Sequence, residues 1–361
     1  NVIANGASVK VSGGTLNIAG YSDTVAGLQL TSGTILGTTG VLTSTTNYDM
    51  QAGTVSAILA GTVGLNKTTS GTVTLNSVNQ YTGLTTISEG ILAYGANDVI
   101  ADGASVRVSG GTLNIGTYSD TIAGLQLTSG SVTGSTGVLT STTNYDMQSG
   151  SVSAILAGNV GLIKTTSGTV TLSGENIYTG LTDVQAGILA YGASNVVANG
   201  ASVKVSGGTL NIGTYSDTIA GLQLTSGSVT GSTGVLTSTT NYDMQSGSVS
   251  AILAGNVGLI KTTSGTVTLS GENIYTGLTD VQAGILAYGA SNVVANGASV
   301  KVSGGTLNIG TYSDTIAGLQ LTSGSVTGST GVLTSTTNYD MQSGSVSAIL
   351  AGNVGLIKTT S

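Results

Sequence analysis

The sequence repeats itself every 97 residues, and this repetition restricts the possible fold more than any other feature. The phrase ASVKVSGGTLNI begins at Ala7, returns as ASVRVSGGTLNI at Ala104, and recurs at Ala201 and Ala298. We divide the sequence into copies 4–100, 101–197, 198–294 and 295–361, the last of them incomplete. Because both ends cut through a copy, we expect residues 1–361 to form one continuous structure that belongs to a longer array.

A shorter period lies inside each copy. In copy 2 a glycine followed by a β-type triplet recurs at steps of 18 to 21 residues, and the next copy resumes the series at Gly208. These five glycines are Gly111, Gly130, Gly150, Gly168 and Gly187. Each copy therefore consists of five coils of about nineteen residues.

Stacking the coils on these glycines produces columns of apolar side chains. Two residues after the glycines stand Leu113, Val132, Val152, Val170 and Leu189. Three residues before them stand Val108, Leu127, Met147, Thr165 and Val184. Since alternate side chains of a strand face the same side, these columns predict an apolar interior, with glycine at a corner that tolerates positive φ. The sequence predicts an all-β fold, a right-handed parallel β-helix (solenoid) with about five rungs per copy.

The composition excludes several kinds of site. The chain has no His or Cys, so it lacks the residues of Ser-His-Asp and Cys-His triads and of ordinary zinc or haem sites. Its net charge of −7 argues against a nucleic-acid partner, and no apolar run is long enough for a transmembrane helix. We expect exposed, solvated acids at Asp102, Asp120, Asp146, Glu175 and Asp183. Near-identical copies argue against one active site, so we predict no catalytic, cofactor-binding or metal-binding residues and no enzyme activity.

An outward column four residues before each glycine carries charges that alternate in sign. It contains Asp146, Lys164, Asp183 and Lys204, which we call the charge ladder. Like charges on adjacent rungs would repel each other, so the alternation favours one register. It predicts Lys164 within salt-bridge reach of Asp146 or Asp183.

A second outward surface, here called the hydroxyl strip, is nearly free of charge. Its members are Thr112, Asn114, Ser131, Thr133, Ser151, Ser153, Thr169 and Thr171. The strip is either ordinary β-surface or a contact face for neighbouring rods, glycans or ice. The Ile188 and Ala190 rung interrupts it, which weakens the ice-binding interpretation.

The tyrosines of each copy invite two interpretations. Tyr145 and Tyr191 fall in inward columns, which indicates packing. Tyr118 and Tyr178 stand on the third, variable side of the coil, where they either plug a corner or offer exposed rings to carbohydrate.

The segment LIKTTSGTVTLSGENIYTGLTDVQAGILAYG, residues 162–192, resembles the autotransporter-associated β-strand repeat, also called the passenger-associated repeat. The resemblance rests on Lys164, Gly168, Thr169, Val170, Thr171, Leu172, Gly174, Asn176, Tyr178, Thr179, Gly180, Thr182, Val184, Gly187 and Leu189. It recurs from Leu65 and Leu259, and Leu181 departs from the glycine usual in the family. The resemblance implies a secreted β-helical passenger of a Gram-negative bacterium.

These observations predict a structural protein of the bacterial cell surface, secreted and extracellular. We expect a fibre, stalk or adhesin passenger that gives reach and rigidity and makes multivalent contacts with cell surfaces, glycans or copies of itself side by side. The alternative is a glycan- or ice-binding solenoid that uses the hydroxyl strip. A carbohydrate-active β-helix enzyme is a remote third possibility.

Overall fold

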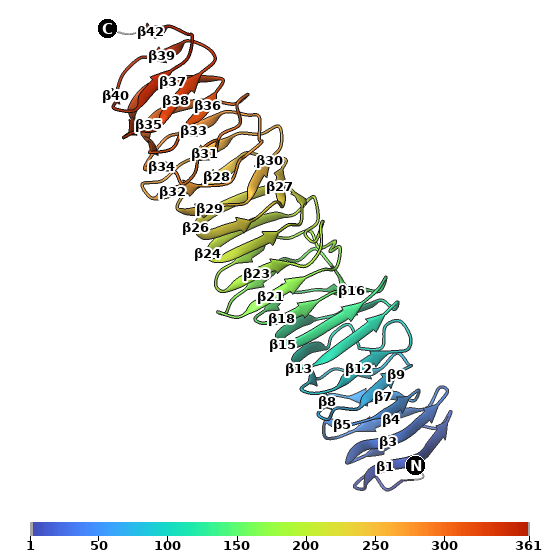
Figure 1. The fold of residues 1–361 in the computed structure, drawn as a ribbon. Coiled ribbons are helices and arrows are strands. Elements are labelled where there is room, and N and C mark those ends of the chain that lie inside the picture. The colour runs from blue at the N-terminus through green and yellow to red at the C-terminus, as the bar shows by residue number, and fades with distance from the viewer. Residues whose placement is uncertain (1–2, 360–361) are drawn as a thin grey trace. The chain divides into compact units, whose positions relative to one another are not determined.

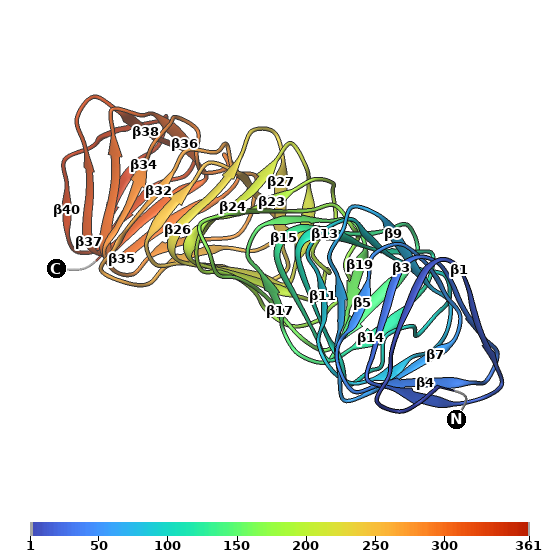
Figure 2. The ribbon, with the colours of Figure 1, turned by 90° about the horizontal axis from the view of Figure 1, so that it is seen from below.

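The computed structural model describes residues 3–359, and every regular element in that range is a β-strand. The protein divides into two compact units, residues 1–180 and 181–361, which we describe separately. Within each unit, the paired strands all run parallel to their partners in neighbouring coils (Figure 1). Seen from below, the coils of the first unit wind around a shared interior (Figure 2). The predicted parallel β-solenoid is therefore confirmed.

In the first unit, the strands of the two glycine-linked sides form one sheet system. They are β1 (Ser8–Ala19), β3 (Gly27–Gly37), β5 (Tyr48–Met50), β6 (Gly53–Val55), β8 (Leu65–Lys67), β9 (Thr72–Leu75), β11 (Thr85–Ile87), β12 (Ile91–Tyr94), β13 (Ser105–Gly116), β15 (Gly124–Gly134), β17 (Tyr145–Met147), β18 (Gly150–Val152), β20 (Leu162–Lys164) and β21 (Thr169–Leu172). The third side carries two small sheets. Their strands are β2 (Asp23–Val25), β4 (Val41–Ser44), β7 (Ile58–Gly61) and β10 (Gln80–Tyr81), then β14 (Asp120–Ile122), β16 (Val138–Ser141) and β19 (Ile155–Ala157).

The second unit repeats this plan. Its glycine-linked sides contain β22 (Thr182–Val184), β23 (Ile188–Tyr191), β24 (Ser202–Gly213), β26 (Gly221–Gly231), β28 (Tyr242–Met244), β29 (Gly247–Val249), β31 (Leu259–Lys261), β32 (Thr266–Leu269), β33 (Thr279–Val281), β34 (Ile285–Tyr288), β35 (Ser299–Gly310), β37 (Gly318–Gly328), β39 (Tyr339–Met341), β40 (Ser345–Val346) and β42 (Leu356–Lys358). Its third side contains β25 (Asp217–Ile219), β27 (Val235–Ser238), β30 (Ile252–Ala254), β36 (Asp314–Ile316), β38 (Val332–Ser335) and β41 (Ile349–Ala351).

The glycine corners bring the backbones of successive coils very close together. Gly130 and Gly150 have φ of 89° and 124°, a region that residues with a side chain rarely adopt. A Cβ at Gly150 would lie 2.3 Å from the carbonyl oxygen of Gly130, and one at Gly130 would lie 2.2 Å from that of Gly111. Glycine is therefore needed at these corners both for the backbone angle and for the space.

The interior of the coils is apolar, as predicted. The side chains two residues after the five glycines of copy 2 are all completely buried. Tyr145 and Tyr178 are also completely buried, with ring centroids 6.1 Å apart, and the Tyr145 hydroxyl lies 2.7 Å from the Leu139 carbonyl oxygen. Tyr178 thus fills the interior instead of offering a ring to solvent, whereas Tyr118 is half-buried.

One predicted register is wrong at the same place in copies 1, 2 and 3. Met147 pairs with Lys164 instead of Thr165, and Val152 pairs with Leu172 instead of Val170, so Gly168 does not stack on Gly150. The corner between Lys164 and Leu172 holds three more residues than the corner between Met147 and Val152. After the corner the shift is two residues, which leaves the same strand face inward and keeps Val170 and Leu172 buried.

Candidate functional site

In copy 2, four members of the hydroxyl strip form one outward column. Thr112 pairs with Ser131, Ser131 with Ser151, and Ser151 with Thr171, while Asn114 pairs with Thr133 beside them. The hydroxyls of Thr112 and Ser131 are 2.9 Å apart and hydrogen-bonded.

The wide corner changes the membership of the strip. Because Ser151 stands opposite Thr171, Thr169 lies beyond this column, on an exposed position at the start of β21. Ser153 is half-buried and follows the end of β18. The strip is interrupted once per copy: in the second unit Ile285 pairs with both Thr266 and Thr306. Such a surface consists of hydroxyl segments separated by an apolar rung.

The charge ladder differs from its prediction at one residue. Asp146 faces outward, where Gln126 donates to its Oδ2 at 2.6 Å and Thr165 donates to its Oδ1 at 3.2 Å. Arg107 donates from Nε to Gln126 Oε1 at 2.6 Å. In the second unit, Asp183 pairs with Lys204 on adjacent rungs. These side chains form a polar ladder joined by glutamine.

A shallow groove follows this ladder in both units. In the first unit it measures about 270 Å³ and is lined by Leu84, Arg107, Gln126, Asn144 and Asp146, among others. The equivalent groove in the second unit measures about 290 Å³, with the equivalent positions Leu181, Lys204, Gln223, Asn241 and Asp243. The groove thus recurs with the 97-residue period of the sequence. One ladder residue differs between the two grooves, Arg107 against Lys204, and both side chains are positively charged.

Lys164 is not part of the outward ladder. Its side chain is completely buried and stacks on Met147, while Ile163 takes the outward position opposite Asp146. The prediction that placed Lys164 in the outward column is therefore wrong. The Lys164 ammonium donates to the carbonyl oxygen of Thr166 in the wide corner. Lys261 does the same with Thr263, and it also donates to the Ala283 carbonyl at 3.1 Å.

The buried lysines fill the wide corners and supply donors to backbone carbonyls there. Burial lowers the pKa of Lys164 and Lys261, and the attraction of Asp146 and Asp243 respectively opposes this shift. The sequence contains a signal for this placement. In the run Leu162–Ile163–Lys164, Leu162 and Lys164 share a face by simple alternation, whereas counting back from Gly168 puts Ile163 inward.

Replacing Lys261 by methionine removes the donor to the corner carbonyls while it keeps a long apolar side group. We expect the variant to lose about 1–3 kcal/mol of stability, because the carbonyl oxygens of Thr263 and Ala283 lose a partner. The measurement is the urea midpoint followed by circular dichroism. The matched control is Lys301→Met, because Lys301 is the copy of Lys204 on the outward ladder and pairs with Asp280. Its expected change in stability is within about 0.5 kcal/mol. A Lys261→Met midpoint equal to that of the control would show that the corner does not need the ammonium.

A second group of charged residues is buried, contrary to the expectation of solvated acids. Asp120, Asp217 and Asp314 are each about 2% exposed, at the inward start of β14, β25 and β36. Asp120 Oδ2 accepts from the Ile100 N–H at 3.0 Å, and its two copies accept from the equivalent N–H groups at the same distance. Burial raises the pKa of Asp120 to about 7 and the pKa of Asp217 and Asp314 to about 6.

A tyrosine of the preceding coil interacts with each of these carboxyls. Tyr94 interacts with Asp120, and Tyr288 with Asp314, and each tyrosine is about 5% exposed. The sequence signal missed here is again alternation: in Asp120–Thr121–Ile122 the inward Ile122 places Asp120 on the same face.

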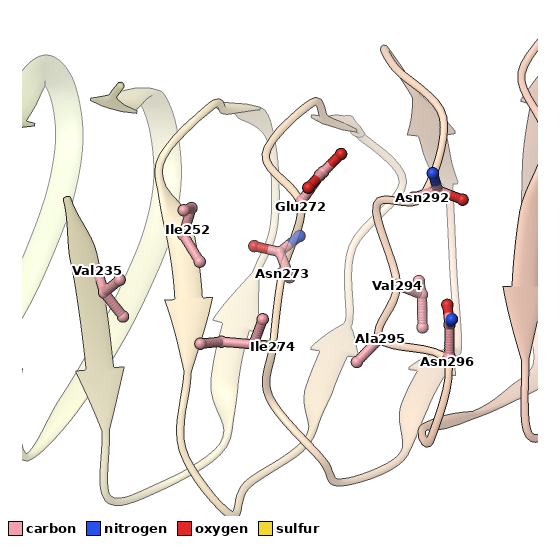
Figure 3. Close-up of a pocket in the computed structure, with 9 residues that line it drawn as sticks. All are labelled: Val235, Ile252, Glu272, Asn273, Ile274, Asn292, Val294, Ala295 and Asn296. Carbon is pink, nitrogen blue, oxygen red and sulfur yellow. The ribbon is translucent and has the colours of Figure 1, made fainter. Parts of the chain in front are cut away.

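A hollow of about 500 Å³ lies on the third side of the second unit beyond the β27–β30 pair (Figure 3). Val235, Ile252 and Ile274 supply its apolar wall, and Ile274 is 55% exposed. Glu272 stands on the same coil as Ile274, and Asn292 and Asn296 stand on the next coil (Figure 3). Asn273 is buried and joins its coil to the coils on both sides, since its Oδ1 accepts from the Leu253 N–H and its Nδ2 donates to the Val293 carbonyl at 2.7 Å.

Residues 3–359 contain no group of three or more acidic, His or Cys side chains arranged to hold a metal ion. In the same range, no helix of the length and hydropathy needed to cross a membrane occurs.

Comparison with known proteins agrees with the repeat structure. The model of the passenger-associated-transport-repeat matches residues 65–93, 162–190 and 259–287, which begin at the strands that carry the buried lysines. The chain is 34% identical over 248 residues to the adhesin BmaC autotransporter of Brucella suis biovar 1 (strain 1330). That match covers 62% of the chain and only 7% of the length of the relative. No solved structure matches. The chain is therefore a tandem-repeat β-solenoid whose sequence contains three matches to the passenger-associated-transport-repeat model.

Proposed function

We propose that this protein is a non-catalytic stalk or fibre of a bacterial cell-surface adhesin, secreted and extracellular, which makes multivalent contacts through its hydroxyl strip. The observation that carries the proposal is the recurrence of the same hydrogen-bonded outward column in each unit. The similarity to a protein named as an autotransporter adhesin supports the location and the class of function.

The strip suits many weak contacts. Its side chains are short, uncharged and partly held by one another, so they lose little conformational entropy when a partner covers them. A contact made once per copy is made repeatedly along an array, and the sum gives avidity without a strong single site. The preferred partner is a second solenoid lying alongside, whose strip carries the same segments at the same intervals.

A glycan-binding solenoid is the second candidate. The hollow of the second unit supports it, because the apolar wall of Ile252 and Ile274 faces a rim of one carboxylate and two amides. Such a rim suits hydroxyl groups of a neutral sugar, and Glu272 disfavours an anionic one.

The two candidates are separated by placing lysines on the strip. In the variant Thr74→Lys, Thr171→Lys and Thr268→Lys, three strip positions gain a charge, and side-by-side strips would repel each other. We expect bundling, measured by light scattering and negative-stain microscopy, to be abolished. The control changes Thr43, Thr140 and Thr237 to lysine, which face outward from the third side at the same spacing.

The outcomes of this experiment are distinct. Loss of bundling in the strip variant alone supports lateral association. Equal bundling in the wild type and both variants would remove the strip from the proposal. Retention on immobilised dextran that the strip lysines leave unchanged, and that Glu272→Ala abolishes, would support the glycan candidate instead.

A further inference from the structure

The copies share a tight exposed turn that contains Asn-Gly or Asp-Gly. Asn5–Gly6 and Asp102–Gly103 occupy it in the first unit, and Asn199–Gly200 and Asn296–Gly297 occupy it in the second. In each turn the carbonyl of the preceding alanine accepts from the N–H of the alanine after the glycine at 2.8 Å. The eight turn residues are all exposed, and a Cβ added at any of the four glycines would meet nothing within 4 Å.

We propose that Asn199 and Asn296 are sites of spontaneous, self-directed deamidation. The backbone nitrogen of the following glycine attacks the amide carbonyl carbon (Cγ) of the asparagine, forms a new C–N bond and closes a succinimide ring. The bond between Cγ and Nδ2 breaks, and ammonia leaves with the proton lost from the glycine nitrogen. Water then opens the ring at either carbonyl, giving Asp or isoaspartate. Glycine favours the attack because no side group shields its nitrogen or restricts its φ and ψ.

The first unit already carries aspartate, a product of deamidation, at the equivalent position of this turn. Position 102 is Asp, and it occupies the same turn with the same 2.8 Å hydrogen bond, between Ala101 and Ala104. Conversion of Asn199 or Asn296 to Asp therefore needs no change in the turn.

The modification alters the charge of the hollow in the second unit. Asn296 lines that hollow with Glu272, so its conversion adds a second carboxylate there. In the first unit the equivalent hollow positions hold Asp98 and Asp102, and the position of Glu272 holds Val78. The first unit thus keeps acidic residues on one of the two coils only, which is the arrangement that like-charge repulsion favours. Deamidation of Asn296 breaks this pattern and is expected to change what the hollow accepts.

The test is peptide mapping of the folded protein after storage in mildly alkaline and in slightly acidic buffer. Mass spectrometry follows the replacement of the amide NH₂ by OH, and chromatography separates the isoaspartyl peptide. We expect converted fractions at Asn199 and Asn296 that exceed those at Asn211 and Asn308 many-fold and that increase with alkalinity. These two controls precede isoleucine, lie inside β24 and β35, and have their Oδ1 held by the N–H of Gly213 and Gly310 at 3.0 Å.

Gly297→Ala supplies the internal control. The substitution is sterically free, so the protein is expected to fold. We expect it to suppress conversion at Asn296 and leave conversion at Asn199 unchanged within the same molecule. Conversion at the turns no faster than at Asn211 and Asn308, or equal conversion of Asn296 with and without Gly297→Ala, would overturn the proposal.

Discussion

Gly150→Ala is expected to destabilise the first unit by roughly 3 kcal/mol or more. The native φ of 124° is strained for alanine, and the added Cβ would meet the Gly130 carbonyl oxygen at 2.3 Å. That oxygen is backbone and cannot move without separating two coils. The measurement is the midpoint of thermal and urea unfolding followed by circular dichroism.

Gly103→Ala is the matched control for this substitution. Its Cβ would meet nothing within 4 Å, and its φ lies outside the left-handed region. We expect a change between zero and a stabilisation of about 1 kcal/mol, because alanine reduces the entropy of the unfolded state. Equal midpoints for the two variants would mean that the corner does not bring the coils into the contact described.

Acidification is expected to stabilise the solenoid between pH 8 and pH 5. The folded-state pKa is about 7 for Asp120 and about 6 for Asp217 and Asp314, against about 3.9 in the unfolded state. Folding therefore takes up protons in this range, and the stabilisation is complete below the unfolded pKa and is lost as pH rises through 6 to 7. Each carboxyl contributes on the order of 3 kcal/mol across the full transition.

Unfolding midpoints measured over this pH range check the prediction. Asp217→Asn keeps an oxygen that can accept from the Val197 N–H, removes the ionisation, and is expected to flatten the pH dependence. Asp183→Asn changes an outward carboxyl of the ladder and is expected to leave the dependence intact. Stability that rises from pH 5 to pH 8 in the wild type would contradict the placement of these carboxyls in the interior. For Asp120, the groups that act on the carboxyl are Asp98, Tyr81 and Tyr94, and neither tyrosine ionises in this range.

The coil period and the apolar columns were predictable because two local rules repeat without interruption. Glycine marks the corner, and strand alternation marks the face, so Leu113, Val132 and Val152 were assigned to the interior correctly. Both rules depend only on neighbouring residues in the sequence, and each copy confirms the assignments of the others.

The buried charges were not predicted, for a physical reason. Residue type suggests that Lys164 and Asp120 are exposed, since burial of a charge is costly unless partners are present. Their partners are backbone groups, the Thr166 carbonyl of the same corner and the Ile100 N–H of the preceding coil, which carry no signal in the sequence. Alternation within Leu162–Lys164 and Asp120–Ile122 favours the observed faces, and it is a better guide here than residue type.

The third side was the least predictable part of the coil. Its strands are short, and the coil that follows β30 closes through the buried amide of Asn273 instead of a strand. The hollow exists because that coil and the next one lack strands there. Amide contacts of this kind depend on the distance between coils, which a linear sequence does not state.

The pairing of strands also determines how the molecule responds to force. Partners in adjacent coils are separated by only 17 to 21 residues, and every ladder hydrogen bond joins one coil to the next. A terminus that is pulled away therefore loads the bonds of its own coil first, one after another, while the coils behind it stay closed. Each coil that peels off releases about twenty residues, or roughly 65 Å of extended backbone. Such a solenoid lengthens in small steps under tension, absorbs work at each step, and offers an intact edge on which the released coil can close again.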